Sequence, residues 1–174
     1  MAQAVEMFFD ERADAAVRAL WAELADAGLP SLATLTHRRH RPHVSLFVAE
    51  SLDRADLTGL RTVLADRHPA LRLSALATFP GREGVLFLGV TVTAELLALQ
   101  AQAHQSVAGQ QAGCWPLYRP GCWMPHCTLA FGLDREQIAA AYRVLHGYQP
   151  VQAVASTVGM TDNVTGAVTP LAGS

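Results

Sequence analysis

Two five-residue segments of this chain share one pattern and lie 83 positions apart. Residues 42–46 read PHVSL and residues 125–129 read PHCTL, so each has a proline, a histidine and, two positions later, a hydroxyl residue. In an extended strand, residues two apart point to the same side. Each segment is therefore predicted to place an imidazole and a hydroxyl side by side on one face of a strand.

The same offset relates much of the remaining chain. The first half is predicted to run strand, helix, strand, helix, strand, at residues 4–9, 10–27, 43–48, 52–67 and 71–79. The second half repeats this order at residues 85–92, 93–111, 126–131, 134–146 and 151–160, followed by a weak strand at 167–171. Because strand falls on strand and helix on helix, the pattern indicates an internal duplication.

Local signals add three further expectations. A short edge strand is predicted at residues 32–36, after Pro30 breaks the chain. The helix at 134–146 begins with a capping box, since Asp134 is followed by Gln137 three residues later. A loop rich in Gly, Pro and Trp, residues 112–125, leads into the second motif.

The duplication predicts an α+β fold of two pseudo-symmetric β-α-β-α-β lobes. The length suits one domain spanning residues 1–174, with the lobe repeats at about residues 4–83 and 84–171. An approximate two-fold axis between such lobes brings the two motif strands face to face. Their facing sides then form a pocket with two acid–base groups and two hydroxyls.

Composition excludes several classes of function and location. The net charge of −2 argues against a general nucleic-acid coat, and all thirteen cationic residues are arginine, which excludes a lysine nucleophile. We expect a cytoplasmic protein with no membrane partner, because no apolar run reaches transmembrane length and the N-terminus has no signal-like segment. The cysteines form no C-x-x-C pair and are expected to be reduced thiols: Cys114, Cys122 and Cys127.

The paired histidines, His43 and His126, suggest acid–base chemistry on a phosphodiester. Histidine titrates near neutrality, so one imidazole of a pair can take a proton from water while the other donates one to a leaving oxygen. The hydroxyls of Ser45 and Thr128 are placed to hold the non-bridging phosphate oxygens. This chemistry needs no metal, and the sequence leaves open which histidine is the base.

Two other reactive groups need interpretation. Cys127 adjoins His126, but strand alternation turns its side chain to the opposite face, which predicts a buried core thiol. A zinc site is an alternative for the histidines at positions 37, 40 and 43. Intervening arginines would repel a dication there, and Pro42 disfavours a helical face.

Four further residues are candidates for substrate binding. Arg41 belongs to an arginine cluster that either guides an anionic substrate or is solvated loop charge. Trp123 or Tyr118 can stack on a base, with Arg119 on a phosphate. The alternative for these loop residues is packing of the loop itself.

The two H-x-[ST]-L segments, in a duplicated α+β frame of this size, resemble the two-histidine (2H) phosphoesterase superfamily. Within it, the chain looks most similar to the bacterial 2'-5' RNA ligase / RNA 2',3'-cyclic phosphodiesterase group. The resemblance implies two lobes around a central concave cleft, with His43 and His126 as the catalytic pair and Ser45 and Thr128 as phosphate-binding hydroxyls. It also implies activity without a metal or other cofactor on 2',3'-cyclic phosphates of RNA or nucleotides.

We therefore expect a metal-independent cyclic phosphodiesterase whose substrate is a small nucleotide or an RNA terminus with a cyclic phosphate. Ala130 and Phe131 stand where many bacterial members carry a basic residue, which disfavours a long RNA. The alternatives are a non-catalytic nucleotide- or RNA-binding module and 2'-5' RNA ligase activity in the same cleft. We expect a monomer with no obligate protein partner.

Overall fold

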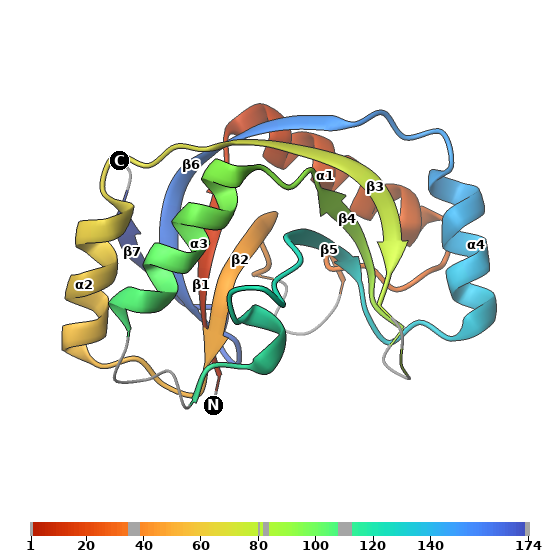
Figure 1. Cartoon of the computed structure of the whole chain (residues 1–174). Coiled ribbons are helices and arrows are strands. Elements are labelled where there is room, and N and C mark those ends of the chain that lie inside the picture. Colours follow the sequence, from red (N-terminus) through yellow and green to blue (C-terminus); the bar gives the residue numbers. More distant parts are fainter. Residues whose placement is uncertain (1, 35–38, 80, 82–83, 108–112, 173–174) are drawn as a thin grey trace.

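The structure, a computed structural model, describes residues 2–34, 39–79, 81, 84–107 and 113–172 (Figure 1). The elements of the first half are β1 (Gln3–Phe9), α1 (Glu11–Asp26), β2 (His43–Ala49), α2 (Arg54–Leu64) and β3 (Ala70–Thr78). Those of the second half are β4 (Leu86–Val90), α3 (Ala94–Ser106), the 3-10 helix η2 (Pro116–Tyr118), β5 (His126–Ala130), α4 (Arg135–Leu145), β6 (Val151–Asp162) and β7 (Val168–Ala172). The predicted α+β order of two β-α-β-α-β repeats is confirmed.

All strand pairs of the sheet are antiparallel, in the order β2-β1-β6-β3-β4-β5, with β7 paired to β6. The third strand of each repeat is exchanged: β3 pairs with β4 of the second half, and β6 pairs with β1 of the first. The expected boundaries at residues 4–83 and 84–171 thus describe repeats along the chain, while in space each repeat completes the sheet of the other. The sheet curves strongly, so that its two end strands, β2 and β5, lie in contact (Figure 1).

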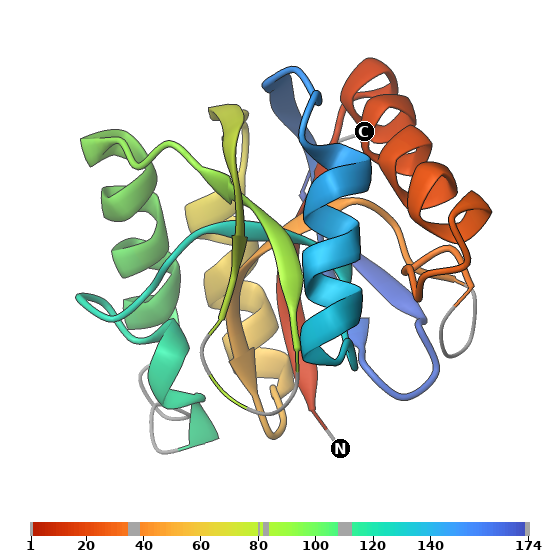
Figure 2. The ribbon, with the colours of Figure 1, turned by 90° about the vertical axis from the view of Figure 1, so that its right-hand side faces the viewer.

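The helices lie in two pairs, one at each side of the curved sheet (Figures 1 and 2). Helix α1 packs against α4, and α2 packs against α3. The capping box predicted for α4 is confirmed, since Asp134 and Gln137 each bond the other's backbone N–H. Within the described residues, no helix is both long enough and apolar enough to cross a membrane.

The edge strand predicted at residues 32–36 is wrong in its described part. Residues 32–34 form a turn in which the Thr34 N–H donates to the Ser31 carbonyl oxygen at 3.1 Å. Leu32 is buried, and its N–H donates to the Leu129 carbonyl oxygen at 2.9 Å. The apolar signal came from a core contact with β5, and residues 35 and 36 lie outside the described part of the chain.

Each motif strand is irregular at the same position. The β1–β2 register shifts so that Leu46 has no residue opposite it, and the β4–β5 register shifts in the same way at Leu129. Both residues directly follow the hydroxyl residue of their motif. A β-bulge bends a strand and re-aims its side chains. The duplication therefore extends to the local backbone geometry of the two motifs.

Candidate active site

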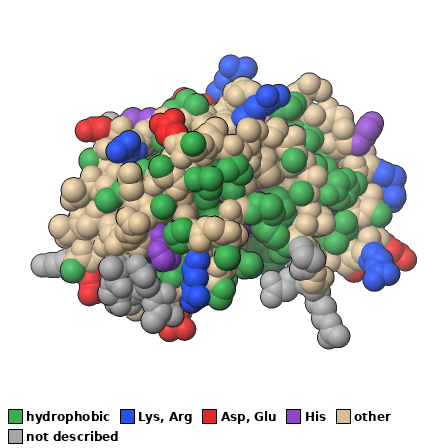
Figure 3. All heavy atoms as spheres, viewed as in Figure 1, with side chains coloured by type: hydrophobic (Ala, Val, Ile, Leu, Met, Phe, Trp, Pro, Cys, Tyr) green, Lys and Arg blue, Asp and Glu red, His purple; other side chains and the backbone are tan. Residues whose placement is uncertain are grey.

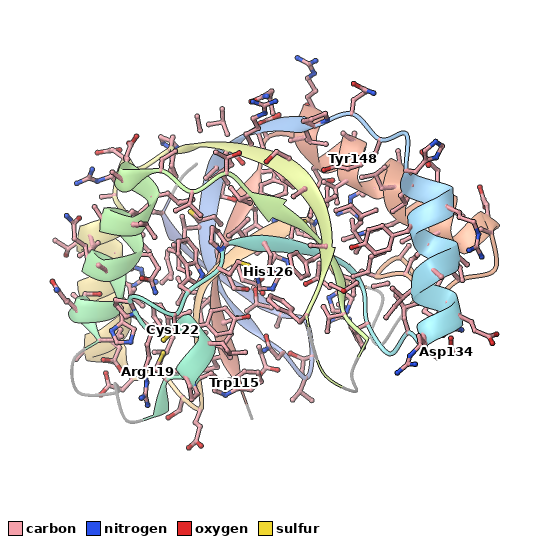
Figure 4. The ribbon with its side chains drawn as sticks, turned by 45° about the vertical axis from the view of Figure 1, so that its right-hand side comes forward. Trp115, Arg119, Cys122, His126, Asp134 and Tyr148 are labelled. Carbon is pink, nitrogen blue, oxygen red and sulfur yellow. The ribbon has the colours of Figure 1, made fainter. Side chains whose placement is uncertain are left out.

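The four motif side chains line one cavity of about 280 Å³ between β2 and β5. His43 and Ser45 enter it from β2, while His126 and Thr128 enter it from β5. Within each strand the histidine and the hydroxyl residue share a face, as strand alternation requires. The structure thus brings together the four residues expected to do the chemistry, and Figure 4 shows His126 near the middle of the molecule.

The His43 ring is held at both nitrogens. Its Nδ1 lies 2.7 Å from the carbonyl oxygen of Arg41, and its Nε2 lies 3.2 Å from Oε1 of Glu6 on β1. The Arg41 guanidinium lies over the Phe8 ring at 4.4 Å, a cation–π contact that fixes the segment before β2. Both the ring orientation of His43 and its charge partner are therefore set by the protein.

The His126 ring has the same backbone contact but different surroundings. Its Nδ1 lies 2.8 Å from the carbonyl oxygen of Met124, again two residues earlier in the chain. The rings of Phe79 and Phe87 pack against it in steeply inclined, T-shaped contacts, with centroids at 4.8 and 5.2 Å. Burial lowers the pKa of His126 below its ordinary value of 6.5, and the nearby His43 lowers it further. His126 is thus suited to be neutral near pH 7, with the proton on Nδ1 and a free electron pair on Nε2.

Indole groups from the opposite half hold the backbone of both hydroxyl residues. Nε1 of Trp123 donates to the Ser45 carbonyl oxygen at 2.9 Å, and Nε1 of Trp21 donates to the Thr128 carbonyl oxygen at 3.3 Å. The Tyr118 phenol also shares a hydrogen bond with the Ser45 hydroxyl, and burial raises the pKa of Tyr118 to about 12. Tyr118 therefore stays protonated and can act as a donor in the cavity.

Leu46 and Leu129, which have no residue opposite them in the strand ladder, accept hydrogen bonds from other elements. Gln100 on α3 donates through Nε2 to the Leu46 carbonyl oxygen at 3.3 Å and to the Tyr118 carbonyl oxygen at 2.7 Å. The Leu32 N–H fills the same role at Leu129. Buried carbonyl groups need such donors once a ladder is interrupted. Both motif strands are thus held by donors from neighbouring elements at the hydroxyl residue and at the unpaired residue that follows it.

The candidate substrate-binding residues fall into two groups. Arg41 and Tyr118 line the cavity. Trp123 is buried in the core, where its indole supports Ser45, and Arg119 is exposed and outside the cavity lining (Figure 4). Trp123 therefore serves to pack the loop. The residues placed where they could stack on a base are Tyr118 and its neighbour Trp115.

The basic segment before β2 is only partly described. Arg39 and His40 line the cavity together with Arg41, whereas His37 and Arg38 lie outside the described residues. Among the described His, Cys, Asp and Glu residues, no three come together as a metal-binding group. The zinc hypothesis needs His37, so it stays a prediction about a segment beyond these residues.

The Cys127 side chain is buried on the face of β5 away from the cavity. Burial raises the pKa of this thiol to about 12. A thiol with so high a pKa carries almost no thiolate near neutrality, and thiolate is the nucleophilic form. The sequence-based interpretation of Cys127 as a core thiol therefore agrees with the geometry.

Several cavity residues were missed by the sequence reasoning. Glu6 is the clearest, because it is 5% exposed and contacts a motif histidine. Its signal was a single carboxylate within the apolar strand at residues 4–9, and a buried charge is costly unless it is paired. Trp115, which lines the cavity, and Phe79 and Phe87, whose rings pack against His126, gave no comparable signal, because apolar residues in strands and loops are common.

A second, larger cavity of about 680 Å³ adjoins the first and shares His126 and Thr128 with it. None of its described lining residues is charged. Apolar side chains from the loop before β5, from the β3–β4 connection and from the end of β5 form much of its wall: Phe79, Val85, Trp115, Leu117, Met124 and Phe131. In Figure 3 hydrophobic side chains gather across the middle of the face that it shows. We call this second cavity the apolar groove.

Comparison with known proteins places this geometry in context. The sequence model of the 2'-5' RNA ligase superfamily matches residues 9–166. No curated protein matches the chain in sequence.

Three solved structures illustrate the similarity of the fold. TT0787 of Thermus thermophilus is 15% identical, with a TM-score of 0.61 over 98% of this chain and 95% of its own. LigT of E. coli in complex with NADP+ is 17% identical, with a TM-score of 0.59 over 97% of this chain and 92% of its own. Usb1 of Kluyveromyces marxianus with uridine monophosphate is 11% identical, with a TM-score of 0.50 over 98% and 97%.

Proposed function

This chain belongs to the 2'-5' RNA ligase superfamily, and from that membership we propose that it is a metal-independent cyclic phosphodiesterase. Its substrate would be a nucleotide or RNA end with a 2',3'-cyclic phosphate. The observation that carries the proposal is the single cavity in which two histidines and two hydroxyls converge from equivalent strands. This is the group of residues that in-line hydrolysis of a phosphodiester requires.

The reaction needs one neutral and one protonated imidazole. The neutral ring takes a proton from water as its oxygen bonds to phosphorus, and the protonated ring gives a proton to the ester oxygen as its bond to phosphorus breaks. Ser45 and Thr128 lie on opposite walls of the cavity, where their hydroxyls can donate to the non-bridging oxygens as charge develops. The product is a phosphate monoester, and no metal is needed for either proton transfer.

The lining of the two cavities supports a small nucleotide as substrate. LigT of E. coli has been solved with NADP+ and with 3'-AMP, and Usb1 with uridine monophosphate, so nucleotides bind to proteins of this fold. In this chain Trp115 lines both cavities and is 48% exposed. We place the phosphate between the histidines and the base against Trp115 in the apolar groove, since aromatic side chains stack on bases. Arg39 and Arg41 are the arginines of the described lining, and two such side chains suit one phosphate better than a long chain.

The test is turnover of a panel of 2',3'-cyclic nucleotides in the presence of EDTA. We expect His43→Ala and His126→Ala each to lower kcat by about a thousandfold, because each removes one of two proton transfers. His146→Ala, at the exposed C-terminal end of α4, is the matched control and should leave kcat unchanged. Full activity of either cavity variant contradicts the mechanism.

Two other results would redirect the proposal. Nucleotide binding without turnover at any pH would indicate a binding module. Joining of RNA halves through 2'-5' linkages, abolished by the same histidine variants, would indicate that ligation is the activity of this site.

A further inference from the structure

The two motif histidines occupy equivalent positions but have opposite neighbours. In β1, Glu6 is the residue opposite Ser45, directly beside the register shift. In β4, Phe87 is the residue opposite Thr128, beside the equivalent shift. The same place in the two repeats thus holds a carboxylate beside His43 and a phenyl ring beside His126. The duplication makes this difference between the two halves of the site directly comparable.

Each carboxylate oxygen of Glu6 lies next to a group that can donate a hydrogen bond. Its Oε1 lies 3.2 Å from Nε2 of His43, and its Oε2 accepts a hydrogen bond from the Thr161 hydroxyl on β6. The His43 ring also meets the Arg41 carbonyl oxygen at Nδ1. A carbonyl oxygen and a carboxylate are both acceptors, so a ring between them is best satisfied when both of its nitrogens carry protons. The geometry around His43 therefore favours the imidazolium.

The contacts of His126 favour the neutral ring. The phenyl rings of Phe79 and Phe87 make T-shaped contacts with it, and no ion pair among the described residues involves it. Removal of water without a compensating charge disfavours a cation. Burial accordingly lowers the pKa of His126.

The remaining charged or titratable groups facing His43 do not duplicate Glu6. Arg39, His40 and Arg41 line the cavity from the segment before β2, and His126 and Tyr118 line it from β5 and η2. The cationic groups among these oppose a positive ring, and burial raises the pKa of Tyr118 so that it stays neutral. Among the described residues of the lining, Glu6 alone supplies negative charge.

We propose that Glu6, held by Thr161, is a positioning residue that keeps His43 protonated and thereby fixes the direction of proton flow. This inference rests on the proposed function and assigns the two acid–base roles within it. His43 is the general acid, and His126 is the general base. Water loses its proton to Nε2 of His126, and the leaving oxygen receives the proton of Nε2 of His43. His126 then releases its added proton to solvent and neutral His43 takes one up, with Glu6 stabilising the new cation.

The length of the Glu6 contact is consistent with this role. Charge-assisted N–H···O bonds are usually about 2.7–2.9 Å long, so a separation of 3.2 Å is a relaxed one. The proton on Nε2 can be shared with a substrate oxygen without breaking a short bond. Glu6 therefore stabilises the acid without competing strongly for the proton it must deliver.

The first experiment compares pH profiles of kcat/KM for the wild type, Glu6→Gln and Glu6→Asp. We expect the alkaline limb of Glu6→Gln to move to lower pH by about one unit, because one nearby opposite charge has an effect of this size. At the alkaline side this is about a tenfold loss, while activity at the acid side is retained. Glu6→Asp keeps the charge and should restore part of the limb. A uniform loss at every pH, equal in both variants, would mean a structural role and overturn the proposal.

The second experiment needs no substrate and so separates this inference from the proposed function. Long-range ¹H–¹⁵N NMR of the imidazoles in the free protein at pH 7 should show two protonated nitrogens in His43 and one in His126. Glu6→Gln should raise the neutral fraction of His43 about tenfold relative to the protonated form and leave His126 unchanged. A neutral His43 in the wild type would overturn the inference even if the enzyme is active. If the NMR result is as expected but no turnover is found, the different protonation of His43 and His126 would be supported and the proposed reaction would be refuted.

Discussion

The environment of His126 predicts where activity is lost on the acid side. A general base works only when neutral, and the pKa of His126 lies below 6.5 because burial lowers it by more than the hydrogen bond to the Met124 carbonyl raises it, with a smaller lowering from His43. As pH falls, the ring therefore stays neutral past 6.5 and gains its proton only at a lower pH. We expect the acid limb of kcat/KM to have its midpoint below pH 6.5. Measurement of the rate profile from pH 4 to 9 checks this.

Replacement of an apolar neighbour of His126 by a polar residue tests whether burial lowers the pKa of this histidine. Phe79 is half-buried, and its ring lies nearly perpendicular to that of His126. Phe79→Asn should let water approach the imidazole and move the acid limb upward, toward pH 6.5. An unchanged limb in a folded variant would show that burial against this ring is not what keeps His126 neutral.

The three cysteines should differ sharply in reactivity. Cys122 is exposed, whereas Cys114 and Cys127 are buried, and burial raises the pKa of both buried thiols. We expect a disulfide reagent to modify one thiol per native molecule, and none in Cys122→Ser. Cys127→Ala should keep turnover while it lowers the free energy of unfolding by about 1 kcal/mol through the small cavity it leaves. Loss of turnover in folded Cys127→Ala would mean that this thiol takes part in the chemistry.

At the scale of elements, the loop before β5 matters because it supports β2. Trp123 on this loop is 7% exposed and donates through its indole N–H to the Ser45 carbonyl oxygen. Trp123→Phe keeps most of the apolar surface but removes the donor. We expect a loss of about 1–3 kcal/mol in the free energy of unfolding, because a buried acceptor is left unpaired, together with a lower kcat.

The matched control for this change is Trp115→Phe on the same loop. Trp115 is largely exposed, so its replacement should change the free energy of unfolding by less than about 0.5 kcal/mol. Urea unfolding of both variants provides the comparison. Equal stabilities would show that the Trp123 hydrogen bond does not hold β2 in place.

Most elements were predictable because their signals are local. The N-terminal cap of α4 is predicted from two residues alone, Asp134 and Gln137. The buried face of α1 follows a helical period: Ala13, Val17, Leu20, Trp21 and Leu24. The strand expected at residues 32–36 failed because Leu32 is buried by a distant strand. A local apolar pattern indicates that a residue is buried, but it does not indicate which element of the fold the residue packs against.

The site was predictable to the same extent. The duplicated motif identified the histidines and the hydroxyls, since their spacing alone puts each pair on one face. Glu6 and Trp123 escaped because their partners, His43 and Ser45, are set by strand pairing and loop packing across long separations. A single carboxylate within an apolar strand therefore predicts a nearby cationic or hydrogen-bonding partner, although the sequence does not show which residue that partner is.

The exchange of third strands governs the molecule as a whole. Strand β3 pairs only with β4 and β6 of the second half among the described residues, and helix α1 packs against α4 and β5. Helix α3 of the second half packs in turn against β2 and α2. The repeats along the chain are therefore not independent folding units, and the cavity lined by the two motif histidines exists only where both are present.

This architecture predicts the behaviour of the two halves as separate fragments. A fragment of residues 1–83 keeps the β1–β2 pair but leaves β3 without a partner, and a fragment of residues 84–174 leaves β6 without β1 and β3. Unpaired strands and uncovered apolar faces cannot repay the entropy of ordering the chain. We expect neither fragment alone to unfold cooperatively, as followed by circular dichroism on heating. An equimolar mixture should regain a cooperative transition and cyclic phosphodiesterase activity, because each half supplies the missing strand of the other. A cooperative transition in either isolated half would show that its lobe folds by itself and that the exchange is not essential.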